Sequence, residues 1–161
     1  SFSKIFSNSL RLGYLIVPDA LLIRFRKTVN RYGTKACFLP QQALAEFMQS
    51  SEFYRHLRRV RRIYGERRKR LLTWLAADFS KYGACKDHQA GMLVVLHLLP
   101  PYKDKEISRI ALQRGLEVKA LSELSAKKPY GNGLLLGYCC LTEEEMATHL
   151  KTLKSCFDDS K

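Results

Sequence analysis

Residues 1–18, SFSKIFSNSLRLGYLIVP, carry the most informative pattern in this chain. Lys4 stands among small hydroxyl residues, a few positions before a short apolar run. A lysine amine that such a loop holds neutral and aims can form a Schiff base with an aldehyde cofactor. Ser1, Ser3 and Arg11 are the hydroxyl and guanidinium groups that a phosphate beside it would need. Taken alone, the same lysine fits an ordinary solvated residue near a chain end better, so the interpretation needs support from elsewhere in the chain.

Length and composition set the protein class. The chain has 161 residues, of which 46% are hydrophobic, so we expect one domain of ordinary size with a real core. This composition excludes a wholly disordered chain. No run of eighteen apolar residues is present, so we expect neither a membrane-spanning helix nor a membrane partner. The chain lacks an initiator methionine and begins inside the lysine motif, so we expect it to be a piece of a longer protein.

The charge balance is strongly basic. Lysine and arginine total 28 against 15 acidic residues, which gives a formal net charge of +13. Such an excess favours anionic partners, such as nucleic acid, phosphate ligands or acidic surfaces. An acidic half of the protein outside this chain would explain the excess equally well.

Cysteine and histidine spacing predicts no metal site. The five cysteines form no CxxC pair, and their spacing is not that of zinc ligands. We expect reduced, buried thiols in a cytoplasmic protein. His56 and His149 are expected at helix surfaces rather than as ligands.

The first third of the chain predicts a strand followed by helices. The apolar run over 10–17 is typical of a strand, and Asp19 can cap a helix over 20–27. Pro40 is a suitable first-turn residue for a helix that continues through Met48.

A long basic helix is predicted next, from Ser50 or Ser51 to about Ala77. Its apolar positions recur every three or four residues, so one face should be buried. Nine lysines and arginines lie between Arg55 and Arg70 on the remaining faces. Two explanations stay open for them, a solvated helix face and a contact with DNA phosphates.

The rest of the chain alternates strands and helices. Strands are predicted over 92–99, 117–121 and 134–140. Asp104 can cap a helix that stops at Gly115, and a capping box at Thr142 and Glu145 can begin the last helix. The order indicates a small α+β sandwich, a short and mostly antiparallel sheet with helices on one side.

Three segments carry a family resemblance. Residues 1–18 resemble the cofactor-lysine segment of fold-type I pyridoxal-phosphate enzymes, in the form found in the aminotransferase-like domain of MocR-type regulators, a branch of the GntR transcription factors. Residues 41–72, QQALAEFMQSSEFYRHLRRVRRIYGERRKRLL, and 133–146, GLLLGYCCLTEEEM, resemble the interdomain helix and the last strand and helix of that family. The resemblance implies that 1–30 is the tail of a large cofactor-binding domain. It implies that 40–161 is the small C-terminal domain, including the long basic helix.

The resemblance also implies roles for individual residues. Lys4 matches the lysine that forms a Schiff base with pyridoxal phosphate, and Arg11 and Ser1 match positions that bind the cofactor phosphate. Leu135 stands where related aminotransferases have the arginine that binds the substrate carboxylate. The aspartate and aromatic ring that complete the family's cofactor site precede the lysine and match nothing in this chain. We therefore expect this piece by itself to bind the cofactor weakly or not at all.

Two functions follow from the resemblance. The first is an effector domain of a DNA-binding regulator, sensing an amine, an amino acid or the cofactor through Lys4. Its DNA would be bound by an N-terminal winged helix-turn-helix outside this chain, in a cytoplasmic homodimer. The second is a class I/II aminotransferase, for which Leu135 makes ordinary amino-acid transamination doubtful. A basic α+β binding module with a coincidental lysine motif is the remaining alternative.

Overall fold

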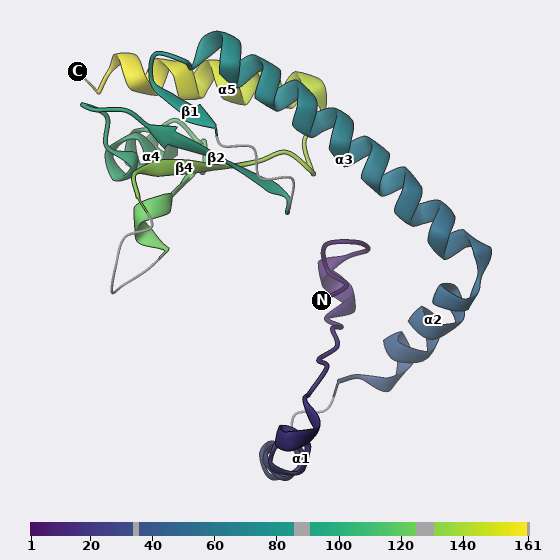
Figure 1. Ribbon diagram of the computed structural model, residues 1–161. Coiled ribbons are helices and arrows are strands. Elements are labelled where there is room, and N and C mark those ends of the chain that lie inside the picture. The colour runs from purple at the N-terminus through teal and green to yellow at the C-terminus, as the bar shows by residue number, and fades with distance from the viewer. Residues whose placement is uncertain (34–35, 86–90, 125–130, 161) are drawn as a thin grey trace. The chain divides into compact units, whose positions relative to one another are not determined.

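The computed structural model describes residues 1–33, 36–85, 91–124 and 131–160 (Figure 1). The chain divides into two compact units, Ser1–Arg61 and Arg62–Lys161. The helices are α1 (Asp19–Tyr32), α2 (Phe38–Gln49), α3 (Ser51–Asp78), α4 (Asp104–Gln113) and α5 (Glu143–Asp158), with short 3-10 turns η1 (Asn8–Leu10) and η2 (Leu121–Glu123). The strands are β1 (Gly83–Cys85), β2 (Leu93–Leu98), β3 (Lys119–Ala120) and β4 (Gly133–Gly137).

The described residues of the first unit form helices and no strand, so the strand predicted over 10–17 is wrong. That segment has no strand partner among the described residues, and Tyr14, Leu15 and Ile16 are at least 69% exposed. Strand structure requires a hydrogen-bonded neighbour, which an apolar pattern alone cannot supply. The following helix α1 starts at Asp19 itself, with Pro18 as its N-cap residue.

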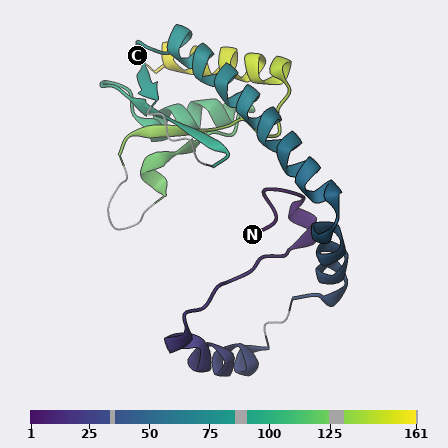
Figure 2. The same cartoon turned by 45° about the vertical axis from the view of Figure 1, so that its right-hand side comes forward.

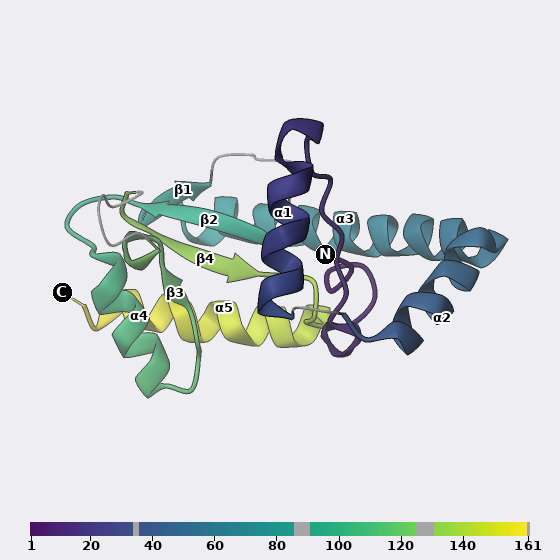
Figure 3. The same ribbon diagram turned by 90° about the horizontal axis from the view of Figure 1, so that it is seen from below.

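The second unit is built on a four-stranded antiparallel sheet in the order β1-β2-β4-β3. Val94 and Leu96 on β2 and Leu134 and Leu136 on β4 are buried, whereas the residues between them are more exposed. This alternation places one face of the sheet against helices. Figure 3 shows α3 and α5 behind the sheet, and Figures 1 and 2 both show α5 alongside the C-terminal part of α3.

The core of this unit lies between the sheet and the helices. Helices α3, α4 and α5 each contribute fully or almost fully buried side chains. These include Leu71 and Leu75 from α3, Ile107 and Ala111 from α4, and Leu153 and Phe157 from α5. The rings of Tyr82 and Phe157 stack with centroids 4.3 Å apart. The predicted α+β class, with helices on one side of a short sheet, is confirmed.

Some helix and strand boundaries differ from the predicted ones, mainly where pairing between strands defines the element. Strand β1 was not predicted, because its three residues form no apolar run, and its pairing with β2 defines it. The predicted strand over 117–121 shrinks to β3, and η2 follows it directly. Gly115 has the expected left-handed backbone, with φ +77°, although α4 already ends at Gln113.

The predicted capping box of α5 is confirmed, and it supports a stability prediction. Thr142 Oγ1 accepts a hydrogen bond from the Glu145 amide at 3.2 Å, and the Thr142 amide donates to Glu145 Oε2 at 2.7 Å. Thr142→Ala removes the cap and is expected to lower the free energy of unfolding by about 1 kcal/mol. Denaturant titration checks this, with Thr142→Ser as the control that keeps the cap. Equal losses in both variants would contradict the cap as the cause.

Candidate functional site

Lys4 lies in a closed loop at the start of the first unit. The Phe2 amide donates to the Leu12 carbonyl at 3.0 Å and joins the two ends of the loop. Within it, the amides of Ile5 and Phe6 both donate to the Phe2 carbonyl at 3.0 Å, which makes the tight turn that carries Lys4. The Lys4 side chain is exposed. The amine is therefore accessible, and the backbone on either side of it is fixed.

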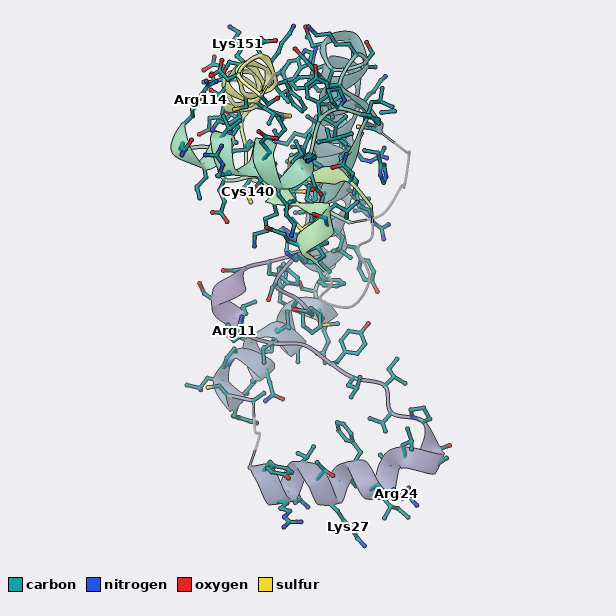
Figure 4. The ribbon with its side chains drawn as sticks, turned by 90° about the vertical axis from the view of Figure 1, so that its left-hand side faces the viewer. Arg11, Arg24, Lys27, Arg114, Cys140 and Lys151 are labelled. Carbon is teal, nitrogen blue, oxygen red and sulfur yellow. The ribbon has the colours of Figure 1, made fainter. Side chains whose placement is uncertain are left out.

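At the loop closure, Ser1 contacts both Ser3 and the residue that follows Arg11. The hydroxyls of Ser1 and Ser3 lie 3.1 Å apart, and Ser1 Oγ also contacts the Leu12 carbonyl at 3.5 Å. Arg11 precedes Leu12 and has φ +48°, a left-handed conformation that is uncommon for a residue with a side chain. Figure 4 marks Arg11 on this segment. The two hydroxyls suit a phosphate, and Arg11, which is exposed one residue before Leu12, is a residue type that binds phosphate.

An aromatic cluster anchors the loop just after Lys4. The ring of Phe6 stacks on His56 of α3, with centroids 5.0 Å apart, and also contacts Phe47 and Phe53. His56 Nε2 lies 2.8 Å from the Ile5 carbonyl oxygen. His56 lies on α3 as predicted, but it is half-buried because it packs against this loop. No local sequence signal identifies this contact, because the partners are 51 positions apart.

Leu135 lies at the middle of β4 on the less covered face of the sheet. Its neighbours on either side, Leu134 and Leu136, are buried against the core, whereas Leu135 is half-exposed. Its paired residues on the adjacent strands are Val95 and Lys119. Paired residues in an antiparallel sheet project to the same face, so Leu135 has one aliphatic neighbour and one cationic neighbour.

Neither a metal cluster nor a membrane helix is found in the parts of the chain that the structure describes. Within them, no group of three or more His, Cys, Asp and Glu side chains could hold a metal ion. None of the helices there is long and apolar enough to cross a bilayer. A hollow of about 250 Å³ in the first unit is lined mainly by apolar residues such as Phe2, Leu44 and Met48, and Lys4 does not line it.

Comparison with known proteins identifies the family. Residues 1–153 match the model of the family described as aminotransferase class I and II. The chain belongs to this family. It is 31% identical over 157 residues, 98% of its length, to the probable rhizopine catabolism regulatory protein MocR of Rhizobium meliloti. It is 25% identical over 96% of its length to the HTH-type transcriptional regulator YdeL of Bacillus subtilis (strain 168). The chain spans 32% and 34% of the lengths of these two relatives, about a third of each.

Solved aminotransferases share the fold. The α-aminoadipate aminotransferase LysN of Thermus thermophilus matches with a TM-score of 0.87 and 24% identity, over 99% of this chain and 41% of LysN. The kynurenine aminotransferase of Pyrococcus horikoshii matches with a TM-score of 0.87 and 16% identity, over 99% of this chain and 40% of that enzyme. The LysN structure is described as a complex with N-(5'-phosphopyridoxyl)-L-leucine. The expected relation to fold-type I aminotransferases is confirmed, and the family implies pyridoxal phosphate as cofactor.

The residues of the loop fit two ends of this cofactor. A primary amine at Lys4 suits the aldehyde, since an accessible lysine amine bonds reversibly to an aldehyde carbon. The adjacent hydroxyls of Ser1 and Ser3 suit the phosphate, and a guanidinium such as that of Arg11 suits it too. All four residues lie in or next to the loop that the Phe2–Leu12 hydrogen bond closes.

Proposed function

We propose that this chain is part of a pyridoxal-phosphate-binding effector domain in a DNA-binding transcriptional regulator of the MocR type. The observation that carries the proposal is the match over nearly the whole chain to proteins named as regulators. The closed loop of Lys4, Ser1 and Arg11 supports cofactor binding. Leu135 supports sensing over amino-acid turnover, because a leucine cannot form the paired hydrogen bonds that hold a carboxylate.

In this proposal each loop residue has a separate role. When bound, pyridoxal phosphate supplies an aldehyde that reacts reversibly with amines. Lys4 would hold that aldehyde in the resting protein, while Arg11 and Ser1 would hold the phosphate. An effector with a primary amine would take the place of Lys4 and leave its amine free. The aromatic contact of Phe6 and His56 lies next to Lys4 and gives a path by which this change reaches α3.

The proposal also assigns the parts of the chain. Residues 1–30 belong with a preceding large cofactor-binding domain, and 40–161 form the small domain that moves against it when the effector binds. The exposed apolar residues Leu15 and Ile16 then pack against that large domain. DNA is bound by a helix-turn-helix domain preceding both, in a cytoplasmic homodimer.

Binding of the full-length protein to DNA tests this function. The probe is a labelled duplex from the region upstream of its own gene, titrated with and without pyridoxal phosphate and with an added primary amine. We expect DNA binding whose affinity changes when the cofactor is present and changes again with the amine. Absence of DNA binding, together with turnover of an amino acid and an oxo acid, would instead support the alternative, a class I/II aminotransferase.

Leu135→Arg tests whether residue 135 faces the ligand. A guanidinium at this position can form a charge-assisted hydrogen bond with a carboxylate, worth about 1.5–3 kcal/mol. We therefore expect the variant of the full-length protein to bind α-amino acids roughly 10- to 100-fold more tightly than the wild type, with little change for amines that lack a carboxylate. Titration followed by cofactor absorbance measures this.

Leu135→Met is the matched control for that variant, since it keeps an apolar side chain of similar volume. It is expected to bind both ligand classes like the wild type. If wild type and Leu135→Arg bind α-amino acids equally, residue 135 does not face the ligand and this part of the proposal fails.

A further inference from the structure

Helix α3 carries a dense cationic surface, which we call the arginine face. It consists of Arg58, Arg59, Arg61 and Arg62, all of which are exposed. In a helix of 3.6 residues per turn these positions form one broad face. Leu57, Val60 and Tyr64 recur on the opposite side and are half-buried. The four guanidiniums therefore stand together on the side of α3 away from its packed stripe.

The arginine face has few acidic groups to balance it. Within 51–78 the acidic residues are Glu52, Glu66 and Asp78. In the described parts of the chain, Glu52 pairs with Arg55 at 2.5 Å and Asp78 pairs with Lys154 at 2.8 Å. No ion pair found there includes a residue of the arginine face. Only Glu66 remains on α3 to offset four like charges within two turns.

The chemistry of the face favours phosphates over a protein partner. Arginine is also common at protein interfaces, but those interfaces centre on apolar or aromatic anchors. Between Arg58 and Arg62 the one apolar residue is Val60, which belongs to the opposite side of the helix. Arginine forks match phosphate oxygens, and all four cations here are arginine rather than lysine.

We propose that the arginine face is a DNA-backbone contact that adds affinity without sequence preference. The proposal rests on the proposed function, in which the full-length protein binds DNA through a separate sequence-reading domain. Each phosphate neutralised on duplex DNA adds about 0.9 to the slope of log affinity against log salt concentration. Four engaged arginines would therefore contribute roughly 3 to 4 to that slope.

The test compares two variants of the full-length protein, each losing four positive charges from one exposed helix. Glutamine replaces the cations, because it preserves helix propensity. The test variant is R58Q/R59Q/R61Q/R62Q on α3, and the control is R24Q/R26Q/K27Q/R31Q on α1. Figure 4 shows Arg24 and Lys27 pointing outward from α1. Affinity is measured over a series of salt concentrations, on the upstream duplex and on an unrelated duplex of equal length.

We expect the α3 variant to lose affinity equally on both duplexes and its salt slope to fall by roughly 3 to 4. The α1 variant should keep the wild-type slope. The double variants R58Q/R59Q and R61Q/R62Q should each lose about half of the effect, which keeps the test valid if the fourfold change perturbs folding.

An unchanged salt slope in the α3 variants would overturn the proposal. An equal fall of the salt slope in the α1 control would also overturn it, because the loss of net charge alone would then explain the effect. If the wild-type protein binds no DNA at all, the proposed function fails first. If instead the wild type binds DNA and the α3 variants bind it equally well, only the proposal for the arginine face fails.

Discussion

Full-length protein carrying Lys4→Ala is expected to retain no covalently attached pyridoxal phosphate. Alanine has no amine, so no bond to the cofactor aldehyde can form at this position. The phosphate contacts proposed for Arg11 and Ser1 remain, so weak non-covalent binding should persist. The loop itself should also persist, because its closing hydrogen bond joins the backbones of Phe2 and Leu12. The expected change is a complete loss of attachment with little change in folding.

Absorbance of the cofactor before and after borohydride reduction measures the attachment. Reduction makes the bond permanent, so mass spectrometry of the digested wild-type protein should find the added mass on the peptide containing Lys4. Lys27→Ala is the matched control, since it removes an exposed lysine from α1 of the same unit. Cofactor mass on the reduced Lys4→Ala protein would refute the assignment of Lys4. Cofactor mass on another lysine of the wild type would refute it too.

The parts of the fold that were predictable have local causes. The apolar periodicity of α3 and the capping box of α5 are set by residues a few positions apart, and both were predicted correctly. The order of strands and helices after 50 was also predicted from the residue pattern, and the family resemblance added the roles of individual residues. The predicted strand over 10–17 failed because a strand depends on its neighbour, and no described residue pairs with that segment.

The missed features depend on contacts between distant positions. Strand β1 exists because Gly83 pairs with Leu98 of β2. His56 meets the Ile5 carbonyl across 51 positions. In the candidate site, the Phe2 amide bonds the Leu12 carbonyl and Ser1 Oγ lies 3.5 Å from the same carbonyl, contacts that the spacing of these residues did not predict. Residue types predicted the chemistry of the site, and only the structure supplied its geometry.

Asp104 is the clearest case of a residue whose role exceeds the predicted one. The sequence predicts Asp104 as a helix cap, whereas Lys103 is the N-cap residue and Asp104 is buried at the first position of α4. Its carboxylate accepts hydrogen bonds from the Lys105 amide at 2.8 Å, the Ser122 amide at 2.9 Å and the Gly133 amide at 3.1 Å. The Ser122 hydroxyl donates a fourth at 2.8 Å. One side chain thus joins α4, η2 and β4.

These hydrogen bonds determine the charge of Asp104. Burial by itself acts to raise the pKa of the carboxyl group, but the hydrogen bonds from Ser122, Gly133 and Lys105 act against it and hold the pKa below its ordinary value. A folded-state pKa below the unfolded value means that the unfolded chain binds the proton more readily. The stabilisation is therefore fully present above the unfolded pKa, about 3.9. It is lost as the pH falls through the lower folded-state pKa.

Asp104→Asn is expected to lower the free energy of unfolding by about 2–4 kcal/mol at neutral pH, because the amide replaces one acceptor oxygen with a donor and leaves buried amides unpaired. Denaturant titration followed by the fluorescence of Trp74, the single tryptophan of the chain, measures the second unit directly. Glu106→Gln is the matched control. It neutralises an exposed carboxylate in the same first turn and should change the free energy of unfolding by less than about 0.5 kcal/mol.

The difference in free energy of unfolding between the wild type and Asp104→Asn should shrink as the pH falls below about 4. A difference that stays constant into strong acid would show that lost packing, rather than the carboxylate, causes the effect.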